Sequence, residues 1–270
     1  MYHYVGKTAL ITGASSGIGE VFARALAKRG MNLILVARTE SKLRALAQEL
    51  GSQYRVNVEV LSIDLGNPGA AQSVRQTTRD AGWRVDLLVN NAGFSTLGAF
   101  ETIPPELEQQ CVMVNIAALL DLTHAYIPDM LEQGEGAIIN MASVLSFVGG
   151  GRQATYAATK AFVFSLSQAL WSDYRKRGIR VFALCPGPVA TGFFEVMGAD
   201  AKLNFMGLMD KPERVVKVGL KAFEKGKPYK LVGWFTKATA LSTRILPRTL
   251  MSRVVHFMTV FIYKPNGKRR

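Results

Sequence analysis

Seven short aliphatic runs alternate along the chain with longer segments of helical periodicity. The runs are 8–12, 33–37, 56–63, 85–89, 137–141, 181–184 and 229–232, and the helical segments are 17–29, 40–50, 69–81, 105–131, 153–176 and 211–225. Alternation of this kind predicts a parallel sheet covered by helices. Because the runs are apolar at successive positions, we expect strands that are buried on both faces. The predicted fold class is α/β with a doubly wound parallel sheet, which binds ligands beyond the carboxyl ends of its strands.

Basic residues are concentrated toward the end of the chain. Residues 1–210 contain 18 Lys and Arg against 18 Asp and Glu, whereas residues 211–270 contain 15 against 2 and account for the whole net charge of +13. An excess confined to one end favours a local anionic partner, such as a phospholipid surface, over a nucleic-acid groove that crosses the fold. A solubilising tail is the alternative explanation.

The segment 233–270 combines these cations with apolar residues at nearly helical spacing. Pro247 is expected to divide it into two helices, because proline interrupts helical hydrogen bonding. Such a basic amphipathic segment could lie on an anionic membrane, cover a pocket of the fold or contact a neighbouring subunit, and the sequence leaves all three open. Its longest apolar stretch, 254–263, is shorter than the roughly 20 residues that a membrane-spanning helix needs.

Cys111 and Cys185 lie in apolar stretches without the spacing of metal ligands. We therefore predict two small buried side chains of a reduced protein, and no metal site. The residues before the first aliphatic run lack the apolar stretch of a signal peptide. These features predict a cytoplasmic protein, with peripheral membrane contact through 233–270 as an open alternative.

A glycine-rich turn, TGASSGIG at residues 12–19, follows the first run and precedes the first helical segment. Backbone N–H groups at a helix N-terminus bind a pyrophosphate, and glycine permits its close approach. Glycine triplets also occur in ordinary strand–helix turns, but this strand and helix context favours a dinucleotide site. The predicted contacts are Gly13, Ser15, Ser16, Gly17, Ile18 and Gly19.

Ala37 and Arg38 stand at the end of the second run, where dinucleotide folds bind the adenosine ribose. An acidic residue there would repel a 2′-phosphate, whereas a guanidinium can form paired hydrogen bonds with it and stack on adenine. The pattern favours NADP(H) over NAD(H). An ordinary solvated arginine at the start of a helix is the alternative, and Ser16 supplies no second cation for the phosphate.

Further nucleotide contacts are predicted where later runs end. Asp64, which could instead cap a helix, can accept a hydrogen bond from the adenine amino group after the third run. The small and amide residues after the fourth run permit close contact with a ribose, although such a tetrapeptide is also a common turn. The complete set comprises Asp64, Leu65, Asn90, Asn91 and Gly93, together with Pro186, Gly187, Val189 and Thr191 for the nicotinamide.

Tyr156 and Lys160 are four residues apart in the segment 153–176, so a helix places both side chains on one face. A phenol has an ordinary pKa of about 10, which makes it a poor acid–base catalyst near neutrality. A neighbouring ammonium stabilises phenolate and lowers that pKa. The spacing therefore suits acid–base chemistry, although the pair by itself is more often an exposed helical pair.

Ser143 and Asn115 complete the candidate catalytic set. Ser143 follows the fifth run, where its hydroxyl could bind a substrate oxygen or could cap a turn. Asn115 lies in a helical segment among apolar neighbours. Asparagine has poor helix propensity and usually faces solvent at such a position, but these apolar neighbours favour a structural or catalytic role for its amide.

The ordered motifs resemble those of the short-chain dehydrogenase/reductase family, over roughly residues 5–232. The resemblance implies a Rossmann-type sheet with strand order 3-2-1-4-5-6-7, and dimers or tetramers packed through the helices that carry Asn115 and Tyr156. It implies that Tyr156 is the general acid/base and that Ser143 orients the carbonyl. It also implies that Lys160 binds the nicotinamide ribose and tunes Tyr156, while Asn115 holds a water in the proton relay.

The resulting hypothesis is an NADPH-dependent reductase of a carbonyl/hydroxyl pair, with a Rossmann-fold catalytic domain over 1–232 and a helical extension over 233–270. Aromatic, aliphatic and Met residues between 192 and 209 favour a lipophilic ketone, such as a fatty-acyl, steroid or isoprenoid-like compound; packing of this loop onto the domain is the alternative explanation. These residues are Phe193, Phe194, Val196, Met197, Leu203, Phe205, Met206, Leu208 and Met209. The alternatives are an NAD-linked alcohol dehydrogenase and a nonenzymatic NADP(H)-binding sensor.

Overall fold

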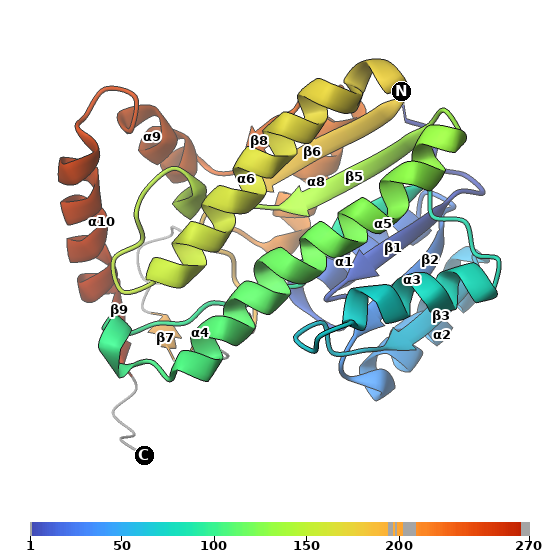
Figure 1. The fold of residues 1–270 in the computed structure, drawn as a ribbon, viewed down its shortest axis with the longest axis horizontal. Coiled ribbons are helices and arrows are strands. Elements are labelled where there is room, and N and C mark those ends of the chain that lie inside the picture. Colours follow the sequence, from blue (N-terminus) through green and yellow to red (C-terminus); the bar gives the residue numbers. More distant parts are fainter. Residues whose placement is uncertain (1, 194–196, 198, 202–208, 266–270) are drawn as a thin grey trace.

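The computed structural model describes residues 2–193, 197, 199–201 and 209–265 (Figure 1). Seven parallel strands form its main sheet, in the order β3-β2-β1-β4-β5-β6-β8. Their bounds are β1 Thr8–Thr12, β2 Asn32–Ala37, β3 Val58–Ser62, β4 Leu87–Asn90, β5 Gly136–Met141, β6 Ile179–Cys185 and β8 Tyr229–Leu231. The doubly wound fold and its strand order are confirmed, with β8 as the seventh parallel strand.

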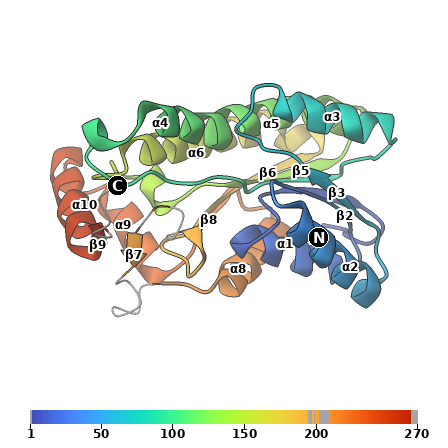
Figure 2. The ribbon, with the colours of Figure 1, turned by 90° about the horizontal axis from the view of Figure 1, so that it is seen from below.

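Helices cover both faces of this sheet (Figure 2). One layer comprises α1 Gly17–Ala27, α2 Glu40–Tyr54 and α8 Pro212–Glu224, and the other comprises α3 Ala70–Asp80, α5 Ala118–Glu132 and α6 Ala154–Tyr174. Each layer encloses its own apolar core, because successive side chains of a strand point to opposite faces. The edge strand β3 departs from the expected burial, since Glu59 and Ser62 are exposed.

The segment predicted as one helix over 105–131 contains a change of helical pitch. It is formed by α4 Pro105–Val112, the π-helical turn η2 Met113–Ala117 and α5. Among the described residues, only the stretch Pro105–Glu132 is long and apolar enough to cross a membrane by length and composition. Its buried side chains pack in the core with those of α3 and the sheet, as expected for a core helix.

Two helices follow the last strand of the main sheet. They are α9 Trp234–Ser242 and α10 Arg248–Ile262, so the predicted division at Pro247 is confirmed. The sequence did not predict the antiparallel pair of β7 Ala199–Ala201 and β9 Tyr263–Pro265. Short 3-10 turns complete the description: η1 Phe100–Thr102, η3 Val144–Ser146 and η4 Arg175–Arg177.

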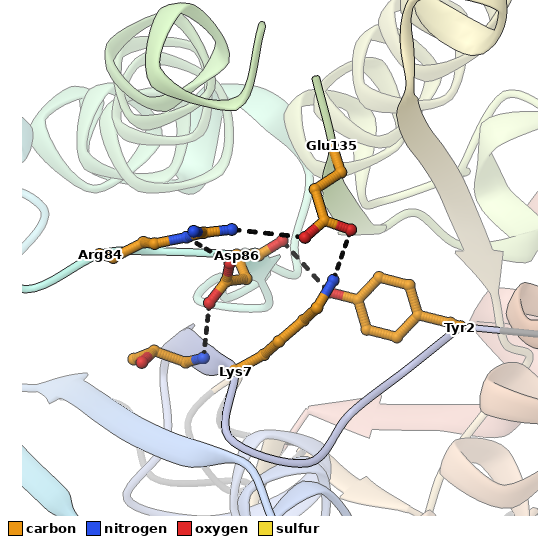
Figure 3. Close-up of polar contacts among 6 residues, drawn as sticks. Tyr2, Lys7, Arg84, Asp86 and Glu135 are labelled. Atoms are coloured by element: carbon orange, nitrogen blue, oxygen red, sulfur yellow. Dashed lines mark hydrogen bonds and ion pairs between the residues drawn. The ribbon is translucent and has the colours of Figure 1, made fainter. Parts of the chain in front are cut away.

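A polar network joins the amino ends of three strands (Figure 3). The Asp86 carboxylate accepts hydrogen bonds from the backbone N–H of Thr8 at 2.8 Å and from Arg84 Nε at 2.7 Å. Lys7 Nζ and Arg84 Nη2 both contact the carboxylate of Glu135. The network ties β1, β4 and β5 together at the end of the sheet opposite the predicted ligand site.

Candidate active site

A cavity of about 970 Å³ opens where the strands of the main sheet end. It is lined by turns that follow β1 to β6 and by side chains of α6, α9 and α10. Most predicted site residues line it, namely Gly13, Ser15, Ser16, Gly17, Ile18, Arg38, Asp64, Leu65, Asn91, Gly93, Ser143, Tyr156, Lys160, Pro186, Gly187, Val189 and Thr191. Gly19, Asn90 and Asn115 are not part of this lining.

Hydrogen bonds hold the glycine-rich turn against the turn that follows β4. Thr12 Oγ1 accepts from the backbone N–H groups of Asn91 and Ala92, both at 3.0 Å, and Asn91 Nδ2 donates to Thr12 O at 2.9 Å. Gly17 begins α1 with φ of 58°, a conformation that favours glycine. These contacts place the first turn of α1 at the cavity, as a pyrophosphate site requires. Thr12 was not among the residues predicted for the site, although a threonine at a strand end beside such a turn is a usable signal.

Asn90 occupies a different environment from the one expected. Its Nδ2 donates to Thr123 Oγ1 at 3.0 Å and to Asn140 Oδ1 at 2.9 Å. Asn140 Nδ2 in turn donates to Ser167 Oγ at 3.0 Å, on α6. The buried amide therefore links β4 to α5 and β5.

Arg38 is well placed at the cavity to meet an anionic group. Its side chain is 69% exposed, and its Nη1 lies 3.9 Å from Asp64 Oδ2. Asp64 Oδ1 accepts from the Gly66 N–H at 2.9 Å, so this carboxylate stabilises the turn after β3 rather than capping α3, whose N-cap is Gly69. The two predicted adenosine-site residues are thus neighbours across β2 and β3.

Tyr156 and Lys160 share the buried face of α6, as the spacing predicted. Lys160 Nζ lies 5.6 Å from the centroid of the Tyr156 ring and donates to Met141 O, at the end of β5, at 2.8 Å. Burial lowers the pKa of Lys160 to about 8, because the ammonium loses its hydration, while Cys111 and Cys185 act in the opposite direction. The lysine is therefore still predominantly charged at neutral pH.

Asn115 lies in the π-helical turn η2, with its amide directed at the strand–helix turn beyond β4. Its Oδ1 accepts from the Phe94 N–H at 3.1 Å, and its Nδ2 donates to Phe94 O at 2.9 Å and to Thr159 Oγ1 at 3.0 Å. An ideal Cβ at Gly93 would lie 2.8 Å from Asn115 Oδ1 and 3.5 Å from Lys160 Nζ. Asn115 is therefore behind the cavity wall, next to the lysine.

Ser143 ends the loop segment that leaves β5 and caps the short helix η3. Its Oγ accepts from the Leu145 N–H at 3.2 Å. Accepting this bond leaves the hydroxyl proton available for a second partner. Ser146, which the sequence analysis overlooked, accepts from the Ser143 N–H and donates to Lys160 O at 2.7 Å, so it fixes η3 against α6.

Apolar side chains surround the part of the cavity near Tyr156. Among the predicted substrate-loop residues, Phe193 lines the cavity with its ring centroid 5.6 Å from that of Tyr156, while Met197 is buried and Met209 is partly buried. Phe194, Val196, Leu203, Phe205, Met206 and Leu208 lie outside the described residues. Further lining residues that the sequence analysis did not assign to the site include Val144, Leu145, Val148, Gln153, Met251 and Met258.

Gln153 is the buried polar member of that set. Its Nε2 donates to Ser95 Oγ at 2.9 Å and contacts Met197 Sδ at 3.7 Å. In the sequence, its membership of the site was indicated only by its position three residues before Tyr156. Across the described ranges, His, Cys, Asp and Glu side chains form no group of three or more that could hold a metal ion.

Comparisons with known proteins agree with this geometry. Residues 7–202 match the model of the family described as short chain dehydrogenase. The chain is 35% identical to oxidoreductase UcpA of Salmonella typhimurium over 212 residues, 78% of each protein. It is 29% identical to very-long-chain 3-oxoacyl-CoA reductase-B of Danio rerio over 257 residues, 92% of this chain and 80% of the relative.

A solved structure, of a short-chain dehydrogenase from Sphingobium yanoikuyae in complex with NADPH, superimposes with a TM-score of 0.80 at 34% identity, covering 91% of this chain and 95% of the other. The family match spans most of the chain. The sheet of the structure also has the strand order that the resemblance to this family implied. The chain therefore belongs to the short-chain dehydrogenase/reductase family, whose members are oxidoreductases that act on hydroxyl and carbonyl groups.

Proposed function

We propose that this enzyme reduces the carbonyl group of a lipophilic substrate, such as a fatty-acyl, steroid or isoprenoid-like ketone, with NADPH. The observation that carries the proposal is that one cavity is lined by the glycine-rich turn, by Tyr156 and Lys160, and by apolar side chains of α9 and α10. Nucleotide-binding and apolar surfaces therefore meet at the candidate proton donor.

The residues of the cavity wall account for the proton chemistry. A bound nicotinamide dinucleotide supplies the hydride. Tyr156 donates its phenolic proton to the carbonyl oxygen, and the Lys160 ammonium, 5.6 Å from the ring centroid, stabilises the phenolate that remains. Ser143 donates its hydroxyl proton in a hydrogen bond to the same oxygen, which fixes the orientation of the carbonyl.

Lys160 has a second role in this proposal, which is to return a proton to Tyr156. Because its pKa is lowered to about 8, the ammonium can release a proton near neutral pH. Asn115 holds the turn beside Lys160 through its two hydrogen bonds to Phe94. We assign it the positioning of a relay water, the role that the family resemblance suggested.

The cofactor preference rests on the residues at the end of β2. Ala37 provides no carboxylate to repel a 2′-phosphate, and the exposed Arg38 guanidinium can bind that phosphate with charge-assisted hydrogen bonds. The other predicted nucleotide contacts that line the cavity keep that role in this proposal. Gly19 and Asn90 do not line the cavity and support the site from outside it. Titration with NADPH and NADH, followed by protein fluorescence, tests the preference through the ratio of the two Kd values.

The lipophilic substrate is favoured by the apolar lining of the cavity and by the similarity to the Danio rerio protein, which is named a very-long-chain 3-oxoacyl-CoA reductase. The test is a panel of ketones that differ in length and polarity, assayed with both nicotinamide cofactors. Reduction of long or polycyclic ketones with NADPH is expected. Turnover of short polar ketones alone would reject the lipophilic assignment, NADH-linked alcohol oxidation would favour an alcohol dehydrogenase, and binding without turnover would favour a sensor.

Exposed apolar residues on the helices that carry the site support a homo-oligomer. Val112 on α4, Leu120 on α5 and Phe162 on α6 are exposed in the single chain. We propose a dimer or tetramer through this face, in a cytoplasmic protein whose catalytic domain spans 1–232 and whose extension spans 233–270. Light scattering of the Leu120→Asp variant, compared with the unchanged chain, tests the interface through a decrease in molecular mass.

A further inference from the structure

Exposed apolar side chains are unusually frequent on one end of the molecule. Of the 14 large hydrophobic residues that are exposed in the described structure, eight lie between residues 234 and 260. We call this surface the α9–α10 face; it comprises Trp234, Leu241, Ile245, Leu246, Leu250, Val254, Phe257 and Val260. A concentration of exposed apolar side chains marks an interaction site more often than an ordinary solvated surface.

Cations accompany these apolar side chains. Lys237 on α9, Arg244 in the connection and Arg253 on α10 are all exposed. The sequence contains no Asp or Glu between residues 225 and 270, against eleven Lys and Arg. The α9–α10 face therefore combines an apolar surface with an unbalanced positive charge.

We propose that the α9–α10 face docks the protein on an anionic membrane surface. Apolar side chains flanked by cations suit such a surface, since the former enter the boundary of the acyl chains while the latter approach lipid phosphates. Docking on a second copy of the same face would bring like charges together across the symmetry axis. A nucleic acid would use the cations and leave the apolar side chains exposed.

The same two helices also form part of the cavity wall. Phe235 and Ala238 of α9 and Val255 and Met258 of α10 line the cavity, and so do three residues of the α9–α10 face, Trp234, Leu246 and Val254. Both helices lie together at one end of the molecule, beside the loop that follows β5 (Figures 1 and 2). Docking therefore places the cavity beside the bilayer, and a lipophilic substrate can enter it without crossing bulk water. This last step rests on the proposed function.

Close packing fixes α10 in this orientation. An ideal Cβ at Gly149 would lie 3.2 Å from Ser252 Oγ, and one at Gly151 would overlap the backbone of His256. The glycines of the loop after β5 thus admit α10 directly against their main chain. Leu250, Phe257 and Val260, which are exposed and do not line the cavity, are thereby held outward, toward solvent or a membrane.

Sedimentation of the full chain with vesicles tests the docking. The vesicles contain phosphatidylcholine alone or phosphatidylcholine with 30% phosphatidylserine, and the salt concentration is varied. The full chain is expected to bind the anionic vesicles at least tenfold more tightly, with affinity that falls as salt rises. Equal and weak binding to both kinds of vesicle would overturn the proposal.

Two variants separate the charged and apolar contributions. Replacing Lys237, Arg244 and Arg253 together by Gln should weaken anionic vesicle binding roughly fivefold per cation, on the order of 100-fold in all. The matched control replaces Lys28, Arg79 and Lys176, which are exposed on other parts of the surface, and should have little effect. An equal loss in the control would show nonspecific attraction and would contradict the proposal.

Ile245→Asp tests the apolar contact, because Ile245 is 75% exposed and does not line the cavity. This variant should lose about tenfold in vesicle affinity, whereas Val5→Asp, at a 66% exposed apolar residue elsewhere, should lose little. Circular dichroism checks that each variant is folded. If Ile245→Asp binds vesicles normally while the triple Gln variant loses both vesicle and duplex DNA binding, the surface binds polyanions generally and the membrane proposal fails.

Turnover separates this inference from the proposed function. The triple Gln variant should reduce a water-soluble ketone at an unchanged rate, but a vesicle-borne ketone with a KM raised at least tenfold. Vesicle binding without reduction of any lipophilic ketone would reject the proposed substrate class alone. Normal reduction of the vesicle-borne ketone without vesicle binding would reject the membrane inference alone.

Discussion

Lys160 Nζ donates a hydrogen bond to the main-chain oxygen of Met141 at 2.8 Å, so a buried ammonium on α6 is anchored at the carboxyl end of β5. The bond holds the cation beside Tyr156, where it can stabilise a phenolate. It also forces the protein to bury a charge. We therefore expect the arrangement to favour proton transfer at the expense of stability.

Lys160→Met should make the protein more stable and inactive. The pKa of Lys160 falls from an ordinary 10.5 to about 8 on folding, so between these values the unfolded state binds more protons than the folded state. Wild-type stability therefore rises with pH across this window, and the full penalty is present below pH 8. At pH 7 the variant should gain roughly 1–3 kcal/mol of unfolding free energy. The measurement is urea unfolding without nucleotide at pH 7 and pH 9.5; a variant less stable than wild type at pH 7 would contradict the prediction.

Tyr156→Phe should abolish turnover while leaving the nucleotide site intact. Removing a general acid lowers the rate by about 10²–10⁴-fold, and the ring itself is retained. Initial rates and an NADPH titration measure the two effects. Tyr174→Phe, at the end of the same helix, serves as the control and should remain active. A Tyr156→Phe protein with normal kcat would refute the role of the phenol.

Arg38→Asp should shift the cofactor preference toward NADH. The exchange removes a cation that can bind the 2′-phosphate and introduces an anion that repels it, so the ratio of kcat/KM values should change by about 10–100-fold. Arg44→Asp is the matched control, because Arg44 is equally exposed but pairs with Glu40 on α2. An unchanged ratio in Arg38→Asp would place the 2′-phosphate elsewhere.

Asp86→Ala should destabilise the fold without affecting the nucleotide site. Asp86 is buried and accepts from the backbone N–H of Thr8, which would lose its partner, and from Arg84 (Figure 3). Loss of these bonds should cost about 2–3 kcal/mol of unfolding free energy. Thermal unfolding and the NADPH Kd are the two readouts. A weakened Kd in the folded variant would mean that the two ends of the sheet are coupled.

Much of the fold follows from local periodicity. The aliphatic runs become the seven parallel strands, and the glycine-rich turn stands between β1 and α1 as predicted. Tyr156 and Lys160 share a helix face for the same reason, because a spacing of four residues is nearly one helical turn. The exposed face of β3 could not be predicted in this way, because local periodicity does not show whether a strand lies at the edge of the sheet.

The sequence by itself determined the fold class, the order of the motifs and the shared helix face of the candidate pair Tyr156 and Lys160, because these depend on neighbours within a few positions. Only the tertiary structure decided that Asn90 bonds to Asn140 on β5, that Asn115 holds Phe94, and that α9 and α10 contribute both to the cavity wall and to the exposed apolar surface. These features depend on partners that are distant in sequence. An amide has several hydrogen-bonding atoms, and a helix has several faces. Tertiary packing decides which partner each atom or face contacts.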